Sequence, residues 1–531
     1  MILYATLQAS IAGMQNVLKH LKTHGTLEGV SALLASFEER QRLVVNHNLT
    51  SSNKNIHNQS KLKQNAFMSG ASNNPHTRAI ARFISQIKYE AIPIEVIGRI
   101  KLLILDSLGC ALFGSALEWS RILRATLAKL DDTRACRVWG TQELLSAPHA
   151  TLINGTLIQS FELDDVHRHG VLHVGAVTLP PLIAITELRS DLSGREFLQA
   201  AVAGYEIGPR VGKCMGAQHI GQGWHSGATV GVFSAVSGAA NALGLSAEQA
   251  IHALGIAGTQ AAGLMAAQYG AMVKRMHAGR AAQSGLYGAL LAEAGFTGIV
   301  DIFESPYGGF CSTFSRSNDR FNLDELSSEL GRTWETMRVS LKFYACVSSN
   351  HTTLDAIKDM QKKAPFNVDD IASIVVHGSQ VTVEHVGWPY EPQGLVSAQL
   401  NLPFCVATLL LEGDVFIEQF NEKAAIDKRR IELSKKVSVV HDPSITARGS
   451  NLRHMVRVEV HLKNGTKLEQ TVEAPRGSEQ SFSSEADIVQ KFKKLVVPII
   501  GETKADNIAG LVLGAEKLDR AEQIAQVLAD V

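Results

Sequence analysis

Residues 161–177 bring carboxylates and imidazoles close together in the chain. Three acids and three histidines fall between positions 162 and 173, namely Glu162, Asp164, Asp165, His167, His169 and His173. The segment that follows, residues 178–184, is apolar. Carboxylates beside imidazoles exchange protons near neutral pH, and apolar surroundings shift their pKa values. The stretch therefore predicts a site for proton-transfer chemistry.

Three further clusters have side chains suited to binding anions or to catalysis. In residues 223–231, His225 precedes small residues that predict a helix, and a helix N-terminus favours an anion. Residues 268–282 add cationic and imidazole side chains to an Ala- and Gly-rich segment: Lys274, Arg275, His277 and Arg280. Residues 342–351 contain Cys346 and His351. No nucleotide-binding loop, zinc motif or nucleophile elbow accompanies these clusters.

Structural interpretations compete with the functional ones in the first two clusters. Asp164 and Asp165 could cap a helix or form an ion pair with Arg168. A single His225 could be a hydrogen-bonded interior residue. The three histidines of the first stretch could bind a metal, although their spacing matches no standard zinc pattern.

The other two clusters also have structural interpretations. Lys274 and Arg280 could belong to an exposed helix face. Cys346 could be a small packing residue, because the sequence defines no partner that would activate its thiol.

Composition narrows the class of protein. The chain has 531 residues, 45% of them hydrophobic and 19% charged, and Lys+Arg equals Asp+Glu at 51 each. A globular, multidomain protein is expected, and the zero net charge argues against a nucleic-acid binder. The six cysteines form no CxxC pair, which favours a reducing intracellular compartment over a disulfide framework. The apolar run 96–113 is interrupted by charges and predicts a buried helix, with no membrane span.

The N-terminal 76 residues differ from the rest. Residues 46–74 are rich in Asn, Ser, Lys and His and predict a disordered linker. Residues 1–40 contain a plausible amphipathic helix, but its acids, Glu28, Glu38 and Glu39, fit poorly with an organelle import signal. We therefore expect a poorly ordered extension over 1–76 and a cytoplasmic protein, with mitochondrial import as the alternative.

Helical patterning dominates from residue 77 to about 335. Ile80, Phe83, Ile84 and Ile87 follow the helical spacing of apolar residues. Residues 246–249 form a capping box that opens another helix. The small residues of 226–243 predict helices whose backbones approach closely.

Strand patterns begin after residue 338. Residues 371–377 predict a strand, and 456–462 and 467–472 alternate around Asn464-Gly465, which predicts a hairpin with a type I′ turn. Helices are expected between these strands, at about 350–363 and 397–412, and helical patterns return over 484–496 and 505–528. The predicted architecture is mainly α with an inserted α+β lid. Its parts are a first helical segment (77–337), the lid (338–482) and C-terminal helices that complete the helical domain (483–531).

Taken together, the four clusters resemble the MmgE/PrpD family, which contains 2-methylcitrate dehydratases and cis-aconitate decarboxylases. The resemblance covers residues 77–530, and its strings lie at 103–112, 161–165, 172–177, 223–228, 263–275, 305–310 and 342–346. The strings at 259–265 and 268–275 look most like the fungal cis-aconitate decarboxylase branch.

This resemblance implies a cofactor-independent enzyme, usually a homodimer, with its active site between the helical domain and the lid. The catalytic residues that it implies are Glu162, Asp165, His173, His225 and Lys274. The residues that it implies for substrate binding are Lys274, Arg275, His277, Arg280, Cys346, His351 and Phe404.

The implied substrate is a di- or tricarboxylic acid. The implied reaction is decarboxylation of cis-aconitate, or of a related alkyl-substituted unsaturated acid, to an itaconate-like product of fungal secondary metabolism. Lys274 and His225 would bind carboxylates, and His173, oriented by Asp165 or Glu162, would deliver a proton to carbon. Dehydration of 2-methylcitrate or a longer alkylcitrate is the alternative, and neither route needs a metal, nucleotide or prosthetic group. A non-catalytic protein that kept the fold is the second alternative.

Three positions depart from the family pattern. Glu162 stands where the family often has Asp, Val166 where Thr or Tyr is common, and Phe404 where an aromatic hydroxyl is common. A site that bonds a substrate hydroxyl rejects analogues without one, so losing two hydroxyls predicts an altered substrate.

Overall fold

The structure is a computed structural model, and it describes residues 74–216, 218–269, 271–449 and 452–529. The predicted linker, amphipathic helix and extension lie outside these residues, apart from positions 74–76. The first described helix, α3 (Pro75–Gln86), already begins at Pro75 and buries Ile80 and Ile84 as its spacing predicts.

Long helices form the part of the fold before residue 338. They are α4 (Ile94–Gly114), α5 (Glu118–Leu127), α6 (Ala147–Ile158), α7 (Val174–Leu188), α8 (Gly194–Met215), α11 (Gly231–Ala242), α12 (Ala247–Gly258) and α13 (Val273–Glu293). The shorter ones are η1 (Tyr89–Ala91), η2 (Gln159–Phe161), α9 (Gln218–Gly221), α10 (Ser226–Thr229), η3 (Met265–Tyr269), α14 (Phe310–Ser315), α15 (Asp324–Ser327) and η4 (Glu335–Arg338). Two short antiparallel pairs join them: β1 (Cys136–Arg137) with β2 (Leu144–Leu145), and β3 (Val166–His167) with β4 (Val339–Ser340).

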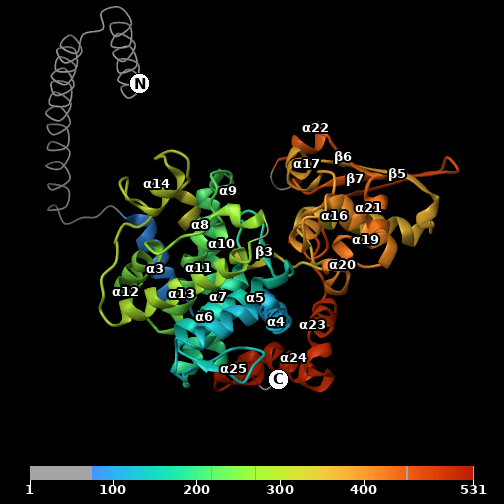
Figure 1. Cartoon of the computed structure of the whole chain (residues 1–531). Coiled ribbons are helices and arrows are strands. Elements are labelled where there is room, and N and C mark those ends of the chain that lie inside the picture. Colours follow the sequence, from blue (N-terminus) through green and yellow to red (C-terminus); the bar gives the residue numbers. More distant parts are fainter. Residues whose placement is uncertain (1–73, 217, 270, 450–451, 530–531) are drawn as a thin grey trace, which may run out of the picture. The chain divides into compact units, whose positions relative to one another are not determined.

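Small residues let these helices pack closely, as predicted. α11 packs against α7, α8 and α13, and α6 packs against α13 (Figure 1). A Cβ placed on Gly279 of α13 would lie 2.0 Å from the Leu152 carbonyl oxygen of α6, so only glycine fits at this crossing. The predicted capping box also forms, since the Gln249 amide donates to Ser246 Oγ at the start of α12.

The α4 segment is the predicted buried helix, and most of its side chains lie in the core. No single helix among the described residues is long and apolar enough to cross a membrane. Within the part of the chain that the structure describes, one bent pair, α4 and α5, reaches the length and composition of a span, and its two helices meet at a bend of 82°.

The α+β part contains a four-stranded sheet in the order β6-β5-β7-β8. β5 (Ile371–Gly378) is parallel to β6 (Val437–His441) and antiparallel to β7 (Val456–Leu462), which pairs with β8 (Lys467–Val472). β6 had no counterpart among the predicted strands. The predicted hairpin forms, but its turn is not type I′. Gly465 has a φ of +88° while the φ of Asn464 is not positive, which fits a type I turn followed by a left-handed glycine.

Helices make up the rest of this part, and α16, α17 and α19 pack against the sheet. The helices are α16 (Ser348–Lys363), η5 (Val368–Asp370), α17 (Gln380–Val386), α18 (Leu395–Leu400), α19 (Leu402–Glu412), η6 (Ile417–Gln419), α20 (Glu422–Ala425), α21 (Lys428–Ser434) and α22 (Pro443–Thr446). The helix predicted over 397–412 is thus two helices. Asn401 caps α19 by accepting a hydrogen bond from the Phe404 amide, and Pro403 occupies the first turn, so a new helix starts there.

The C-terminal helices return to the first part of the chain. They are α23 (Glu485–Ile500), α24 (Glu502–Leu513), η8 (Ala515–Lys517) and α25 (Glu522–Ala529). α23 and α24 pack against α4, and α25 packs against α7 (Figure 1). The predicted fold class, mainly α with a smaller α+β part, is confirmed. The division at residues 337/338 and 482/483 stays a prediction, because residues 73–531 form one compact unit.

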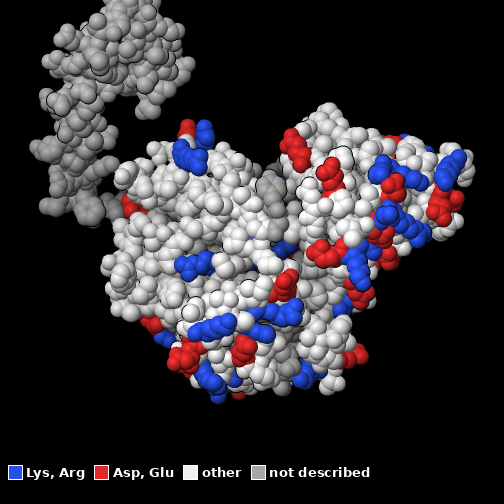
Figure 2. All heavy atoms as spheres, in the orientation of Figure 1, with Lys and Arg blue, Asp and Glu red and all other residues white. Residues whose placement is uncertain are grey.

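Charged side chains on the face shown in Figure 2 lie mainly on the α+β part and along the lower edge of the helical part, and much of the helical part is uncharged. Lys and Arg are interspersed with Asp and Glu, and the described residues form no basic stripe across this face. This distribution agrees with the absence of a net charge in the sequence.

Candidate active site

The acid- and histidine-rich stretch forms the loop between α6 and α7. Glu162 adopts the left-handed conformation with φ 59°, which costs roughly 1–2 kcal/mol for a residue with a Cβ. Its two neighbours in the chain are fixed from outside the loop. The Phe161 carbonyl accepts a hydrogen bond from Gln399 Nε2 of α18 at 3.3 Å, and the Leu163 carbonyl accepts one from Lys491 Nζ of α23 at 2.8 Å. These contacts hold the backbone so that the Glu162 carboxylate keeps its direction.

Three cations surround the buried Glu162 carboxylate. Lys274 Nζ lies 2.5 Å and Arg275 Nη1 2.6 Å from Glu162 Oε1, and Lys342 Nζ lies 3.4 Å from Oε2. We call these four residues the Glu162 cluster. Burial alone would raise the pKa of Glu162, but the three charges hold that pKa well below its usual value. Burial lowers the pKa of Lys274 despite the attraction of Glu162.

The Glu162 cluster has more positive than negative charge. Three cationic side chains face one carboxylate, and Lys274, Arg275 and Lys342 are all largely buried. Coulomb interactions are much stronger in such surroundings than in water, and the excess positive charge favours an added carboxylate. The cluster is therefore suited to a substrate with several carboxylates.

His173 lies at the N-terminus of α7, and its contacts determine which ring nitrogen carries a hydrogen. Its Nδ1 lies 2.9 Å from the Asp165 carbonyl oxygen and 3.0 Å from Asp164 Oδ2. A carbonyl oxygen only accepts hydrogen bonds, so Nδ1 carries a hydrogen and Nε2 is left to gain or lose the exchangeable proton. The ring is 18% exposed, so it is accessible to a reactant, and its charge acts on Glu162.

The Asp165 side chain does not have the predicted contact with His173. Its Oδ1 accepts a hydrogen bond from the Gly175 amide at 3.0 Å, and Tyr205 Oη donates to Oδ2 at 2.8 Å. The carboxylate thus satisfies an otherwise unpaired amide in the first turn of α7, while only the backbone of Asp165 touches the imidazole. Asp164, the neighbouring acid, provides the carboxylate beside His173.

Burial raises the pKa of Asp165 to about 7, although the Gly175 and Tyr205 hydrogen bonds favour its ionised form. The folded chain therefore keeps a proton that the unfolded chain releases near the ordinary value of 3.8. Stability from this group is present at acid pH and is lost as the pH rises through about 7.

We expect Asp165→Asn to flatten the pH dependence of stability. Asparagine keeps the acceptor oxygen but cannot ionise, so the wild-type free energy of unfolding should fall by a few kcal/mol more than that of the variant between about pH 4 and about pH 8. Urea unfolding at several pH values measures this difference. Equal slopes for the two proteins would show that Asp165 ionises normally.

His225 and His277 form a buried imidazole pair beside the Glu162 cluster. Their Nδ1 atoms lie 3.0 Å apart, so one of them carries the hydrogen and the other accepts it. Burial, and next the charge of Lys274, lowers the pKa of each ring. His225 precedes α10, a helix of four residues, and α11 follows it, so the small-residue stretch 226–243 contains two helices. A neutral imidazole at this position offers a substrate one N–H hydrogen-bond donor and carries no positive charge.

Several predicted substrate-binding residues have other surroundings. Arg280 is exposed, and its guanidinium donates to Gln283 Oε1, which does not fit the predicted support of a substrate carboxylate. Cys346, His351 and Phe404 are buried within the α+β part. His351 Nε2 lies 3.1 Å from the Cys346 carbonyl oxygen, and the ring centroids of Phe404 and Tyr390 are 4.3 Å apart. Their roles in binding stay predictions.

The structure adds residues that the sequence reasoning missed. Lys342 is the first residue of the fourth cluster, residues 342–351, but it was not predicted as a site residue, although its charge could have indicated one. Lys491 is fully buried, pairs with Asp106 of α4 at 2.6 Å and supports the loop through Leu163. Tyr205 of α8 holds Asp165. Lys491 and Tyr205 lie in ordinary helical patterns, and nothing in the sequence links them to the loop.

Within the described part of the chain, no group of three or more His, Cys, Asp or Glu side chains is arranged to hold a metal ion. The histidines of the loop face different partners: His167 Nε2 contacts Glu335 at 2.9 Å, whereas His173 contacts Asp164 and Asp165.

The chain is similar to known proteins over most of its length. Residues 78–322 match the MmgE/PrpD N-terminal domain, and residues 344–517 match the MmgE/PrpD C-terminal domain. The cis-aconitate decarboxylase-like protein oryM of Aspergillus oryzae is 35% identical over 460 residues, which are 83% of this chain and 94% of the relative. The cis-aconitate decarboxylase of Aspergillus terreus is 33% identical over 470 residues, 85% of this chain and 95% of the relative. That of Mus musculus is 26% identical over 461 residues, 84% and 91% of the two chains. The two domain matches and the similarity over nearly the full length of these relatives show that the chain belongs to the MmgE/PrpD family.

Proposed function

We propose that this protein is a carboxy-lyase that decarboxylates cis-aconitate, or a derivative of it, to an itaconate-like product. The observation that carries the proposal is the Glu162 cluster, where three buried cations face one carboxylate next to His173. The names of the relatives support the same reaction.

The proposed reaction uses the cations first. Lys274 and Lys342 bind substrate carboxylates, and His225 donates one N–H. The bond between the substrate's methylene carbon and its carboxylate breaks, and CO2 leaves. Its electron pair forms a new double bond, while the pair of the old double bond moves to the far carbon, next to another carboxylate. Positive charge aimed at that carboxylate stabilises the negative charge that develops.

Proton delivery completes the proposed reaction. Protonated His173 transfers a proton from Nε2 to the carbon that holds the electron pair, which yields a methylene group and one remaining double bond. Asp164 lies 3.0 Å from Nδ1 and stabilises the charged imidazole. The Asp165 carbonyl fixes the ring orientation through the same nitrogen. The residues of the site thus supply binding, charge stabilisation and the proton.

Dehydration of 2-methylcitrate or a longer alkylcitrate is less favoured, because the relatives named above are decarboxylases or decarboxylase-like. A direct test incubates the purified chain separately with cis-aconitate, 2-methylcitrate and a longer alkylcitrate, and follows the products by NMR. The proposal predicts CO2 release from cis-aconitate or its derivative. Loss of water without CO2 would indicate a dehydratase, and binding without turnover would indicate a non-catalytic protein.

The proposal also covers the oligomeric state and the cellular compartment of the protein. The chain acts on a small carboxylic acid, and we propose that it does so as a homodimer in the cytoplasm, as the resemblance and the cysteine content suggest. Sedimentation of the purified chain tests the dimer, and fractionation of the source cells tests the compartment.

A further inference from the structure

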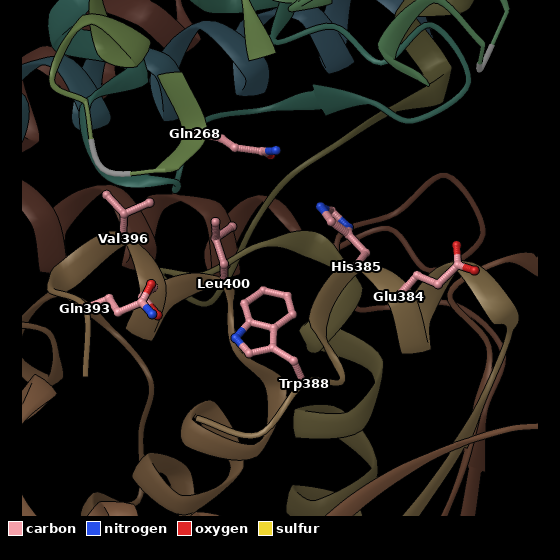
Figure 3. Close-up of a pocket in the computed structure, with 8 residues that line it drawn as sticks. Gln268, Glu384, His385, Trp388, Gln393, Val396 and Leu400 are labelled. Atoms are coloured by element: carbon pink, nitrogen blue, oxygen red, sulfur yellow. The ribbon is translucent and has the colours of Figure 1, made fainter. Parts of the chain in front are cut away.

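A cavity of about 440 Å³ lies between Gln268 of η3 and the helices α17 and α18. Polar side chains form most of its lining, namely Gln268, Glu384, His385, Gln393 and Ser397. Gln268 and His385 point into it from opposite sides (Figure 3). The Glu384 carboxylate points away from His385 and accepts a hydrogen bond from Gln380 Nε2 at 2.7 Å. The cavity therefore offers hydrogen-bond donors to a polar or anionic group.

His385 lies near cations on two sides. The protein around the ring lowers the pKa of His385, the charges of Arg453 and Lys274 lower it further, and the charge of Glu162 opposes them. Its Nδ1 lies 3.3 Å from Ser349 Oγ, and among the described residues Nε2 has no hydrogen-bond partner. An anion beside His385 would thus be attracted by Arg453 and by Lys274, and could accept a hydrogen bond from Nε2.

Arg453 joins the face of α17 that carries His385 to the loop between α6 and α7. Its carbonyl oxygen accepts hydrogen bonds from Ser379 Oγ at 2.6 Å and from Thr382 Oγ1 at 3.2 Å. Thr382 and His385 are three positions apart on α17 and therefore lie on one face. The Arg453 guanidinium donates from Nη2 to the Arg168 carbonyl oxygen of the loop at 3.2 Å. Arg453 is thus held beside both His385 and the loop that carries Glu162 and His173.

The Arg453 guanidinium has donors left for a ligand. Among the described residues it donates to the Arg168 carbonyl and, from Nε at 3.2 Å, to His454 Nε2, which leaves three of its five N–H groups. None of the described acids forms an ion pair with it, and Glu479, whose charge acts on it, pairs with Arg168. Burial, and next the charge of Arg168, lowers the pKa of Arg453. A bound carboxylate would offset both effects.

We propose that Arg453 and His385 form a second carboxylate-binding site, which binds the carboxylate on the central carbon of the substrate. The inference rests on the proposed function. In that reaction one carboxylate leaves as CO2, and a second, which the cations of the Glu162 cluster bind, stabilises the developing negative charge. The carboxylate on the central carbon does neither. Contacts with it therefore hold the substrate and the transition state equally well, and they select acids that have this group.

The kinetic test replaces Arg453 by glutamine, which keeps a donor for the Arg168 carbonyl and removes the charge. KM for cis-aconitate should rise about ten- to a hundredfold, the effect of losing a hydrogen bond between charged groups, while kcat changes much less. Arg453→Lys should recover part of the affinity. Arg448→Gln is the matched control, because Arg448 is exposed and pairs with Glu473 at 3.3 Å. A fall in kcat with unchanged KM would mean that Arg453 only supports the loop, and would overturn the inference.

A binding test separates this inference from the proposed function. Tricarballylate and glutarate differ only by the carboxylate on the central carbon, and neither has the double bond that the reaction needs. Calorimetry at constant ionic strength should find that the protein binds tricarballylate at least tenfold more tightly, and that Arg453→Gln and His385→Ala each reduce this preference. Equal affinities in the wild type, or an unchanged preference in a folded His385→Ala variant, would overturn the inference. The predicted preference without CO2 release from cis-aconitate would instead contradict the proposed function.

Discussion

Replacing His173 by alanine is expected to lower kcat by about a hundred- to ten-thousandfold, the usual contribution of a general acid placed at the reacting atom. Nδ1 of His173 donates a hydrogen bond to the Asp165 carbonyl and lies beside Asp164, so Nε2 is the atom that can deliver the proton to carbon. The measurement is steady-state CO2 release from cis-aconitate or its most active derivative.

The His173→Ala variant should remain folded. The first turn of α7 keeps its hydrogen bond from the Gly175 amide to Asp165, so helix content by circular dichroism should match the wild type. His441→Ala is the matched control, because His441 is exposed at the end of β6, where its Nε2 contacts Thr446. A folded His173→Ala variant with kcat within about threefold of wild type would remove His173 from the mechanism.

Replacing Lys274 by methionine is expected to lower kcat/KM by about a hundred- to a thousandfold, the cost of losing one group that stabilises developing negative charge. Methionine keeps much of the side-chain volume and removes the charge. Glu162 retains Arg275 and Lys342, so its carboxylate stays paired and the loop should keep its conformation. The losses in kcat and KM should be measured separately, because a group that acts mainly in the transition state lowers kcat.

Lys494→Met is the control for the loss of a lysine charge. Lys494 pairs with Asp414 away from the Glu162 cluster, at 2.5 Å, and its side chain is 44% exposed. This variant should keep near-wild-type kcat/KM. If Lys274→Met behaved like Lys494→Met, the cations around Glu162 would have a structural role instead of a catalytic one.

Local sequence patterns predicted much of the fold. The spacing of Ile80 and Ile84 marked α3, and the capping box marked the start of α12. The errors came from finer features of the chain. The turn at Asn464-Gly465 depends on which of the two residues has positive φ, and the break between α18 and α19 depends on a single cap at Asn401. The spacing of apolar residues predicts neither the φ values in a turn nor the position of a helix cap.

The candidate site was predicted to a smaller extent, because its contacts join residues far apart in the chain. His173, Glu162 and Lys274 stood out by type and spacing, and the structure brings Glu162 and Lys274 together. The sequence did not distinguish Asp164 from Asp165, since which acid faces an imidazole depends on the direction of the loop backbone. Lys491 is 328 positions from the carbonyl that it supports, so only tertiary structure reveals the contact.

Decarboxylation in D2O tests the central claim most directly, that the Glu162 cluster and His173 release CO2 from a polycarboxylate and return one proton to carbon. The purified chain should convert cis-aconitate, or its most active derivative, to one CO2 and one itaconate-like product per molecule consumed. NMR should find one deuterium on the new methylene group. Loss of the acid without CO2, or a product with no deuterium at that carbon, would contradict the account.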